Sequence, residues 1–232
     1  MARSSDDAGG GCAHDDEVAD TDRQASTAAE VTKLIELGRD REAAELATRG
    51  GTMDPRDQLA EVGPLLAGVV SGIRPDQLDA PTPCADFTVR GVLEHMIGGA
   101  TLFAAAYNGE QPAEPDTTDP LAAFLPALGG LAESINRPGA LDQTLDTPFG
   151  PTPGDAFARY VALDGLVHGW DLATATGQTY EPDATLVAEI EAHARQMLDP
   201  LRDGTTFAAA VQPPADATPI ERLAAYTGRK VR

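Results

Sequence analysis

One stretch, AFARYVALDGLVHGWDLATATG at positions 156–177, constrains the fold of this chain more than any other. Five of its residues recur at steps of four, three, four and four, which is the spacing of the core-facing stripe of an amphipathic helix. These are Phe157, Val161, Asp164, His168 and Leu172. A buried carboxylate or imidazole without a partner costs several kcal/mol of folding free energy, so the two polar members need something to satisfy them. The stretch therefore predicts a helix that carries polar groups into the core.

A divalent metal would satisfy both groups. Residues at i and i+4 lie one above the other on a helix, and metal-binding helices present two ligands in this way. Asp164 and His168 have that spacing. Metal sites that do chemistry usually take three protein ligands, and His95 is the best candidate for the third among the four histidines. On spacing alone, a satisfied core histidine and a hydrogen-bonded Asp-His pair remain the alternative.

The segment around His95, TVRGVLEHMIGGATLFAAAY at positions 88–107, is a second strongly helical run. Thr88 precedes it as an N-cap. One stripe at helical spacing is expected to face the core, and it includes the imidazole. Its members are Val92, His95, Gly99, Leu102 and Ala106.

Further helices are expected on both sides of these two runs. The segment 54–73 is amphipathic, although Pro64 is expected to kink or divide it. Pro120–Asn136 reads as a core helix, and 141–154 as a short extended or hairpin segment. The remaining helical runs are Asp183–Leu198 and Pro219–Thr227.

The acidic composition narrows the choice of partners. The 17 basic and 37 acidic residues give a formal net charge of −20, and such a surface repels nucleic acid and anionic membranes at long range. No apolar run is long enough to cross a membrane, and the N-terminus lacks the apolar core of a signal peptide. We therefore expect a cytoplasmic protein that binds neither nucleic acid nor membrane. A homodimer through an outer face of the helices stays open.

The two cysteines, Cys12 and Cys84, do not make a disulfide framework. Cys84 is expected to be a small buried loop residue, with a thiol near the mouth of the site as the alternative. Arg222 and Arg229 are expected to form surface ion pairs, with anion binding near the site as the alternative.

Four blocks of sequence are similar, in order, to an actinobacterial-type family of DinB-like metal-binding proteins, which is related to the N-terminal domain of mycothiol-dependent maleylpyruvate isomerase. The blocks are PTPCADFTVRGVLEHMIGG, PGALDQTLDTPFGPTPG, ALDGLVHGWDLATATGQ and PADATPIERLAAYTGRKV. The resemblance implies an all-α fold over residues 53–232, a DinB-like four-helix bundle with short additional C-terminal helices. Residues 1–52 lie outside it and are expected to be a disordered or partly helical extension, or the product of a mis-called translation start.

The resemblance also implies a site and an activity. Its metal-ligand positions match His95, Asp164 and His168, with zinc or alternatively nickel as the ion. The implied function is a mycothiol-dependent transferase or isomerase, in which a metal-bound thiolate attacks a small electrophile. A non-catalytic metal-binding bundle, serving as a sensor or accessory protein, and a metal-dependent hydrolase are the alternatives.

Two neighbours of His168 are candidates for supporting the ligands or facing the substrate. Asp171 lies one turn after His168, where a carboxylate orients a ligand or a bound water. A helix-terminal hydrogen bond or salt bridge is the alternative for Asp171, and packing against another helix is the alternative for Trp170.

Overall fold

A computed structural model describes residues 33, 53–85, 87–198, 202 and 208–231. The expected N-terminal extension, residues 1–52, therefore lies outside the described residues except for Lys33. Along the rest of the chain the elements are α3 (Pro55–Ser71), η1 (Pro75–Gln77), α4 (Val89–Asn108), α5 (Pro120–Asn136), η2 (Ala140–Asp142), β1 (Thr144–Thr147), β2 (Gly150–Pro153), α6 (Gly154–Thr176), α7 (Ala184–Met197) and α8 (Pro219–Tyr226).

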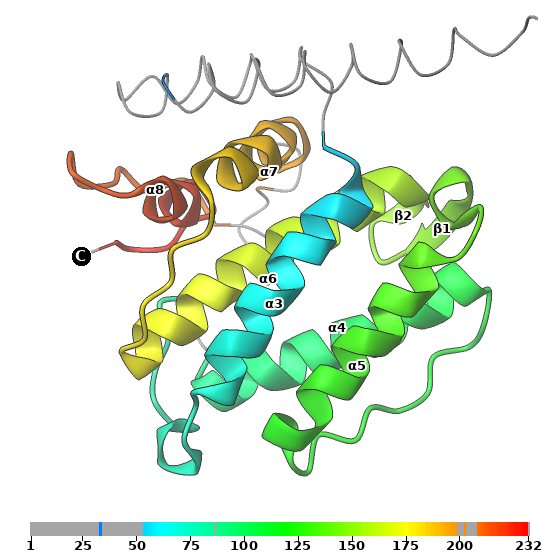
Figure 1. Cartoon of the computed structure of the whole chain (residues 1–232), viewed down its shortest axis with the longest axis horizontal. Helices are drawn as coiled ribbons and strands as arrows, with labels where there is room; N and C mark the ends of the chain where they lie inside the picture. The colour runs from blue at the N-terminus through cyan, green and yellow to red at the C-terminus, as the bar shows by residue number, and fades with distance from the viewer. Residues whose placement is uncertain (1–32, 34–52, 86, 199–201, 203–207, 232) are drawn as a thin grey trace, which may run out of the picture.

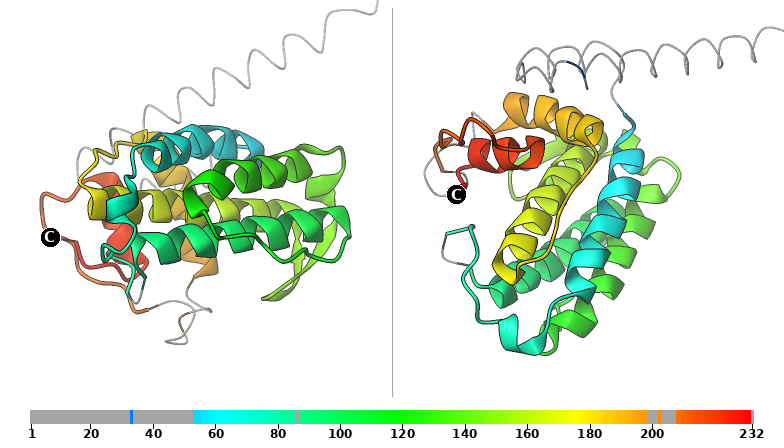
Figure 2. Two further views of the ribbon diagram at one scale, coloured as in Figure 1. Left: turned by 90° about the horizontal axis from the view of Figure 1, so that it is seen from below. Right: turned by 60° about the vertical axis from the view of Figure 1, so that its left-hand side comes forward.

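Four long helices form the bundle that the family resemblance implies. α4 packs beside α5, and α3 packs beside α6, with further contacts from α3 to α5 and from α4 to α6 (Figure 1). α7 and α8 pack against each other and against α6 on the outside of the bundle (Figure 2). The all-α architecture is thus confirmed, and among the described residues no helix is both long and apolar enough to cross a bilayer.

Local signals in the sequence explain where the helices begin and end. The Thr88 side chain accepts from the backbone N–H of Gly91, as expected of an N-cap, and Asp54 and Asp183 cap α3 and α7 in the same way. Gly109 and Gly177 end α4 and α6 in the left-handed conformation, which glycine adopts without a steric penalty. The helices thus begin and end at residues suited to those positions.

The short β1–β2 hairpin confirms the expected extended segment before α6. It is antiparallel, with Thr144 opposite Pro153 and Thr147 opposite Gly150. It lies at one end of the bundle in both views of Figure 2. The hairpin thus leads the chain directly into α6 at Gly154.

α6 is the central helix of the molecule. Residues on all sides of it are buried, including Phe157, Leu163, Leu166 and Leu172, which is typical of a helix enclosed by its neighbours. A Cβ at Gly165 would meet Val62 and Leu66 of α3 at 3.1 and 3.2 Å. The glycine therefore allows α3 to lie close against α6.

Two expectations about the helices are only partly met. α3 is one continuous helix that contains Pro64, so the proline does not divide it. In α4 the expected core stripe is only partly buried, because Val92 is buried whereas His95 and Leu102 are exposed. The buried face also includes Leu93, Met96 and Ile97. α4 is apolar around much of its circumference, so spacing alone did not select the face that meets the other helices.

Candidate metal centre

Three potential metal ligands converge from two helices. The Asp164 Oδ1 atom of α6 lies 3.5 Å from His168 Nε2 on the same helix and 3.7 Å from His95 Nε2 on α4. One ligand atom from each residue lies within 4.8 Å of the other two. The structure therefore brings together the three residues that the sequence singled out.

These separations suit a small divalent ion. In a tetrahedral site with bonds of 2.0–2.2 Å, neighbouring ligand atoms are roughly 3.4 Å apart. The two carboxylate–imidazole separations are close to this value, so small side-chain movements would complete the geometry. Two imidazoles and one carboxylate are also a ligand set that zinc accepts.

The three side chains differ in exposure. The side chain of His168 is 7% exposed, that of Asp164 is 22% exposed and that of His95 is 42% exposed. The group is therefore anchored in the core at His168 and open to solvent at His95. A further ligand from solution would approach on the His95 side.

The charges at this group are coupled. The Asp164 carboxylate raises the pKa of the His95 imidazole, against the opposing effects of burial and of Arg229. Burial alone would raise the pKa of the Asp164 carboxyl group, but His168, His95 and Arg229 outweigh it and the pKa is lowered. Asp164 is therefore ionised at neutral pH and supplies a negative charge to a cation.

Asp171 fixes the orientation of His168. Its Oδ2 atom lies 3.0 Å from His168 Nδ1. Because a carboxylate only accepts, the proton is assigned to Nδ1, which leaves the lone pair of Nε2 directed at Asp164. Asp171 is in turn bound by Arg229, whose Nη2 atom lies 3.0 Å from the same oxygen.

Arg229 also occupies a second group of potential ligands. Cys84, His168 and Asp171 likewise have ligand atoms within 4.8 Å of one another. The guanidinium contacts both Asp171 and Cys84, with Nη2 3.5 Å from the sulfur. A cation at these two residues competes with a metal, so the group of His95, Asp164 and His168 is the better metal site.

The surroundings correct two sequence expectations. Arg229 forms a largely buried ion pair, with 11% of its side chain exposed, rather than a surface pair. Cys84 is half-buried beside the site, which favours the alternative reading of a thiol near its mouth. No local pattern linked these residues to His168, because Cys84 and Arg229 are 145 residues apart and meet only through the tertiary fold.

Trp170 takes no part in the ligand group. It is 7% exposed and belongs to the main hydrophobic cluster. The sequence made it a candidate for supporting the ligands or facing the substrate, with packing as the alternative. Its position agrees with packing.

Comparison with known proteins places this bundle in the DinB-like class. A family model described as the mycothiol maleylpyruvate isomerase N-terminal domain matches residues 59–173, which include all three candidate ligands. Two relatives from Mycobacterium tuberculosis, the uncharacterized proteins MT0763 of strain CDC 1551 / Oshkosh and Rv0738 of strain H37Rv, are each 36% identical over 184 residues. The alignments cover 78% of this chain and 100% of each relative. No solved structure gives a significant match.

The chain belongs to the family of the mycothiol maleylpyruvate isomerase N-terminal domain.

Proposed function

We propose that this protein binds a divalent metal through His95, Asp164 and His168 and uses it to activate a low-molecular-weight thiol, mycothiol or a close analogue, toward a small electrophile. The observation that carries the proposal is the convergence of three ligand atoms from α4 and α6 within 4.8 Å. The reaction is a thiol transfer, or an isomerisation that passes through thiol addition. Zinc is the expected metal, and nickel is the alternative.

The chemistry of the ion explains why a thiol is the expected cosubstrate. A divalent metal lowers the pKa of a thiol that binds to it, so a strong nucleophile is available at neutral pH. The name of the family adds mycothiol as the specific thiol. A cytoplasmic location suits this proposal, because low-molecular-weight thiols stay reduced there.

The residues around the metal have separate roles in this proposal. Asp171 holds the His168 ring in one tautomer and orientation, and Arg229 holds Asp171. Asp164 supplies the negative charge, and the partly exposed His95 borders the side from which the thiol arrives. The proposal assigns no protein group as nucleophile, since the thiol fills that role.

Elemental analysis of untagged protein is the first test, comparing the wild type with His95→Ala. Glu94→Ala is a matched control, because Glu94 adjoins His95 on α4 and its partly exposed carboxylate pairs only loosely with Arg90, at 3.9 Å. We expect close to one equivalent of metal in the wild type and in Glu94→Ala, and a loss of metal in His95→Ala.

A thiol titration then separates an enzyme from a binding protein. The metal-loaded wild type should bind mycothiol and accelerate its conjugation to a test electrophile, and Asp164→Ala should do neither. If the protein holds one equivalent of metal but binds no thiol at millimolar thiol concentrations, the transferase proposal is wrong and a sensor or accessory protein is favoured. Absence of metal after reconstitution would overturn the proposal altogether.

A further inference from the structure

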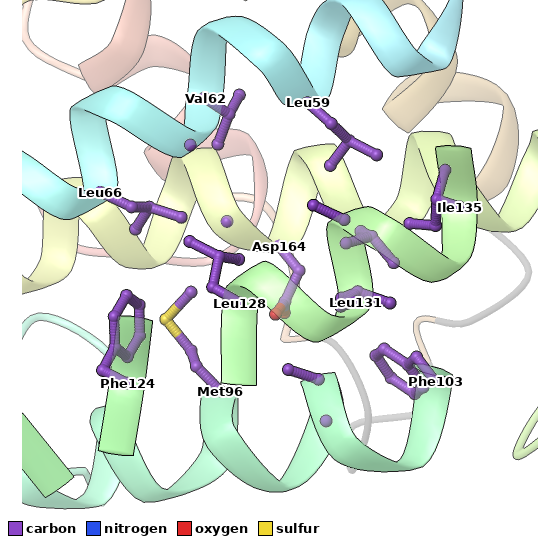
Figure 3. A pocket seen from close by; sticks show the side chains of 16 residues that line it. Leu59, Val62, Leu66, Met96, Phe103, Phe124, Leu128, Leu131, Ile135 and Asp164 are labelled. Carbon is purple, nitrogen blue, oxygen red and sulfur yellow. The ribbon is translucent and has the colours of Figure 1, made fainter. Parts of the chain in front are cut away.

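An apolar cavity of about 80 Å³ lies among α3, α4, α5 and α6. Figure 3 shows its walls, which include Leu66, Met96, Phe124 and Leu131 from three of these helices. Among the described residues that line it, Asp164 is the only charged one. The carboxylate that faces both histidines therefore also forms part of the cavity wall.

The volume sets the size of an occupant. An engineered apolar cavity of roughly 150 Å³ holds benzene or xenon, whereas one water needs only about 10–15 Å³. A cavity of about 80 Å³ therefore has room for a group of about half the size of benzene, such as a short alkyl chain. Its lining offers few polar partners, which disfavours an ordered water cluster.

We propose that this cavity binds the uncharged, apolar part of a small electrophile, and that it excludes electrophiles with a carboxylate at that position. The assignment to the electrophile rests on the proposed function, whereas the preference for a neutral apolar ligand rests on the cavity alone. Maleylpyruvate carries two carboxylates, so the proposal excludes it as a substrate that enters the cavity.

The charge balance supports this exclusion. A carboxylate moved from water into the cavity would lose its hydration and find no basic side chain among the described lining residues. The charges of a divalent metal, the Asp164 carboxylate and a thiolate sum to zero, which leaves no net positive charge for a second anion. A neutral apolar group loses no charge hydration, needs no basic partner, and is stabilised by the burial of its apolar surface.

Two ligands of the same shape test the charge preference. Butanone and propanoate both carry an ethyl group on a carbonyl carbon, and they differ in a methyl group against an anionic oxygen. Methyl NMR spectra of the full-length protein would be recorded with each ligand up to tens of millimolar, and with xenon as a purely apolar probe. We expect butanone and xenon to shift the methyl signals of Leu66, Met96 and Leu131, and propanoate to leave them unchanged.

A pair of glycines in α3 supplies matched variants. An added Cβ has no neighbouring atom within 4 Å at either Gly63 or Gly68, but only Gly63 lines the cavity. Gly63→Leu should weaken butanone binding by about tenfold or more, because one or two methylenes in a small apolar pocket change affinity by that amount. Gly68→Leu should bind butanone like the wild type.

The outcomes separate this inference from the proposed function. Three results would overturn the cavity proposal while leaving metal and thiol binding intact. They are methyl shifts with propanoate as large as those with butanone, no methyl shift with butanone and xenon, and a butanone affinity of Gly63→Leu equal to that of the wild type. Loss of metal or thiol binding with selective butanone binding retained would overturn the proposed function alone.

Discussion

At the scale of single residues, Asp171 determines how the candidate metal centre is held. Its carboxylate is fully buried, and its Oδ2 atom contacts both His168 and Arg229. A metal-binding histidine whose second nitrogen donates to a carboxylate is fixed in tautomer and ring orientation. The strength of metal binding should therefore depend on a residue that does not itself contact the ion.

Asp171→Asn tests this dependence. The amide keeps the size of the side chain but removes its charge, so we expect metal affinity to fall by about 10- to 100-fold. Competition with a chromophoric chelator measures the affinity. Asp155→Asn, at an exposed position in the first turn of α6, is the control and should bind like the wild type. Equal affinities in the two variants would contradict the role given to Asp171.

At the scale of elements, α6 is held by a close contact that leaves no room for a side chain at Gly169. A Cβ at Gly169 would lie 2.8 Å from Cζ of Tyr180. The Tyr180 hydroxyl donates to the carbonyl of Leu166 at 3.1 Å, so the ring is not free to move away. The segment after α6 is thereby fixed against the helix that carries two of the candidate ligands.

Gly169→Ala should therefore destabilise the fold. Overpacking costs about 1–3 kcal/mol, which over most of that range exceeds the gain of about 1 kcal/mol in helix propensity. Urea unfolding measures the change, and Tyr180→Ala in the same background should relieve part of it. Gly98→Ala in α4, where a Cβ has no neighbour within 4 Å, should be neutral or stabilising. A Gly169→Ala variant as stable as Gly98→Ala would refute the close contact.

α7 provides a pH-dependent prediction. Burial, and then the charge of Arg159, lower the pKa of His193 below its usual value of 6.5. The unfolded chain therefore takes up this proton more readily than the folded one. The contribution of neutral His193 to the free energy of unfolding is fully present above about pH 6.5. It declines as the pH falls from there through the lower pKa that His193 has in the folded protein.

His193→Leu removes this titration. Urea unfolding of metal-free protein at pH 8 and pH 5.5 should show a smaller loss of stability in the variant than in the wild type. The comparison at pH 8, where the imidazole is neutral in both states, corrects for the change in packing. Equal losses in the two proteins would assign the pH dependence to other groups.

The sequence predicted most elements and most of the core stripe of α6, but only part of the buried face of α4. α5 begins and ends at Pro120 and Asn136 as predicted, because a proline at the first turn and a core stripe mark it clearly. The core face of α4 was only partly predicted, because apolar residues lie around much of that helix. Helical spacing paired Asp164 with His168, whereas the approach of Arg229 depends on the path of the C-terminal segment, which no local pattern encodes.

At the scale of the whole molecule, the candidate centre joins two helices that contact each other sparingly. α4 packs mainly on α5, and α3 mainly on α6, so α4 and α6 share a smaller interface. A metal held by His95 on one side and by Asp164 and His168 on the other would link these two pairs of helices. Because such an ion binds only the folded chain, it would stabilise the fold by mass action.

Chelation should therefore lower the melting temperature. At a free metal concentration of about 1,000 times Kd the stabilisation is about 4 kcal/mol, and each kcal/mol corresponds to about 2–4 °C in a protein of this size. Differential scanning fluorimetry with and without EDTA measures the shift. Glu94→Ala should respond like the wild type and His95→Ala should not respond. An EDTA-independent melting temperature in the metal-loaded wild type would contradict this link.

Asp164 belongs to both the cavity wall and the candidate metal centre, and a residue shared in this way would couple the binding of a metal to the binding of a cavity ligand. Coupling between two ligands is reciprocal, so any factor by which the metal changes the affinity for a neutral cavity ligand is also the factor by which that ligand changes the affinity for the metal. An electrophile that fits the cavity would thus tighten or loosen the ion before any bond is made, and the metal occupancy of the protein would report the presence of its substrate.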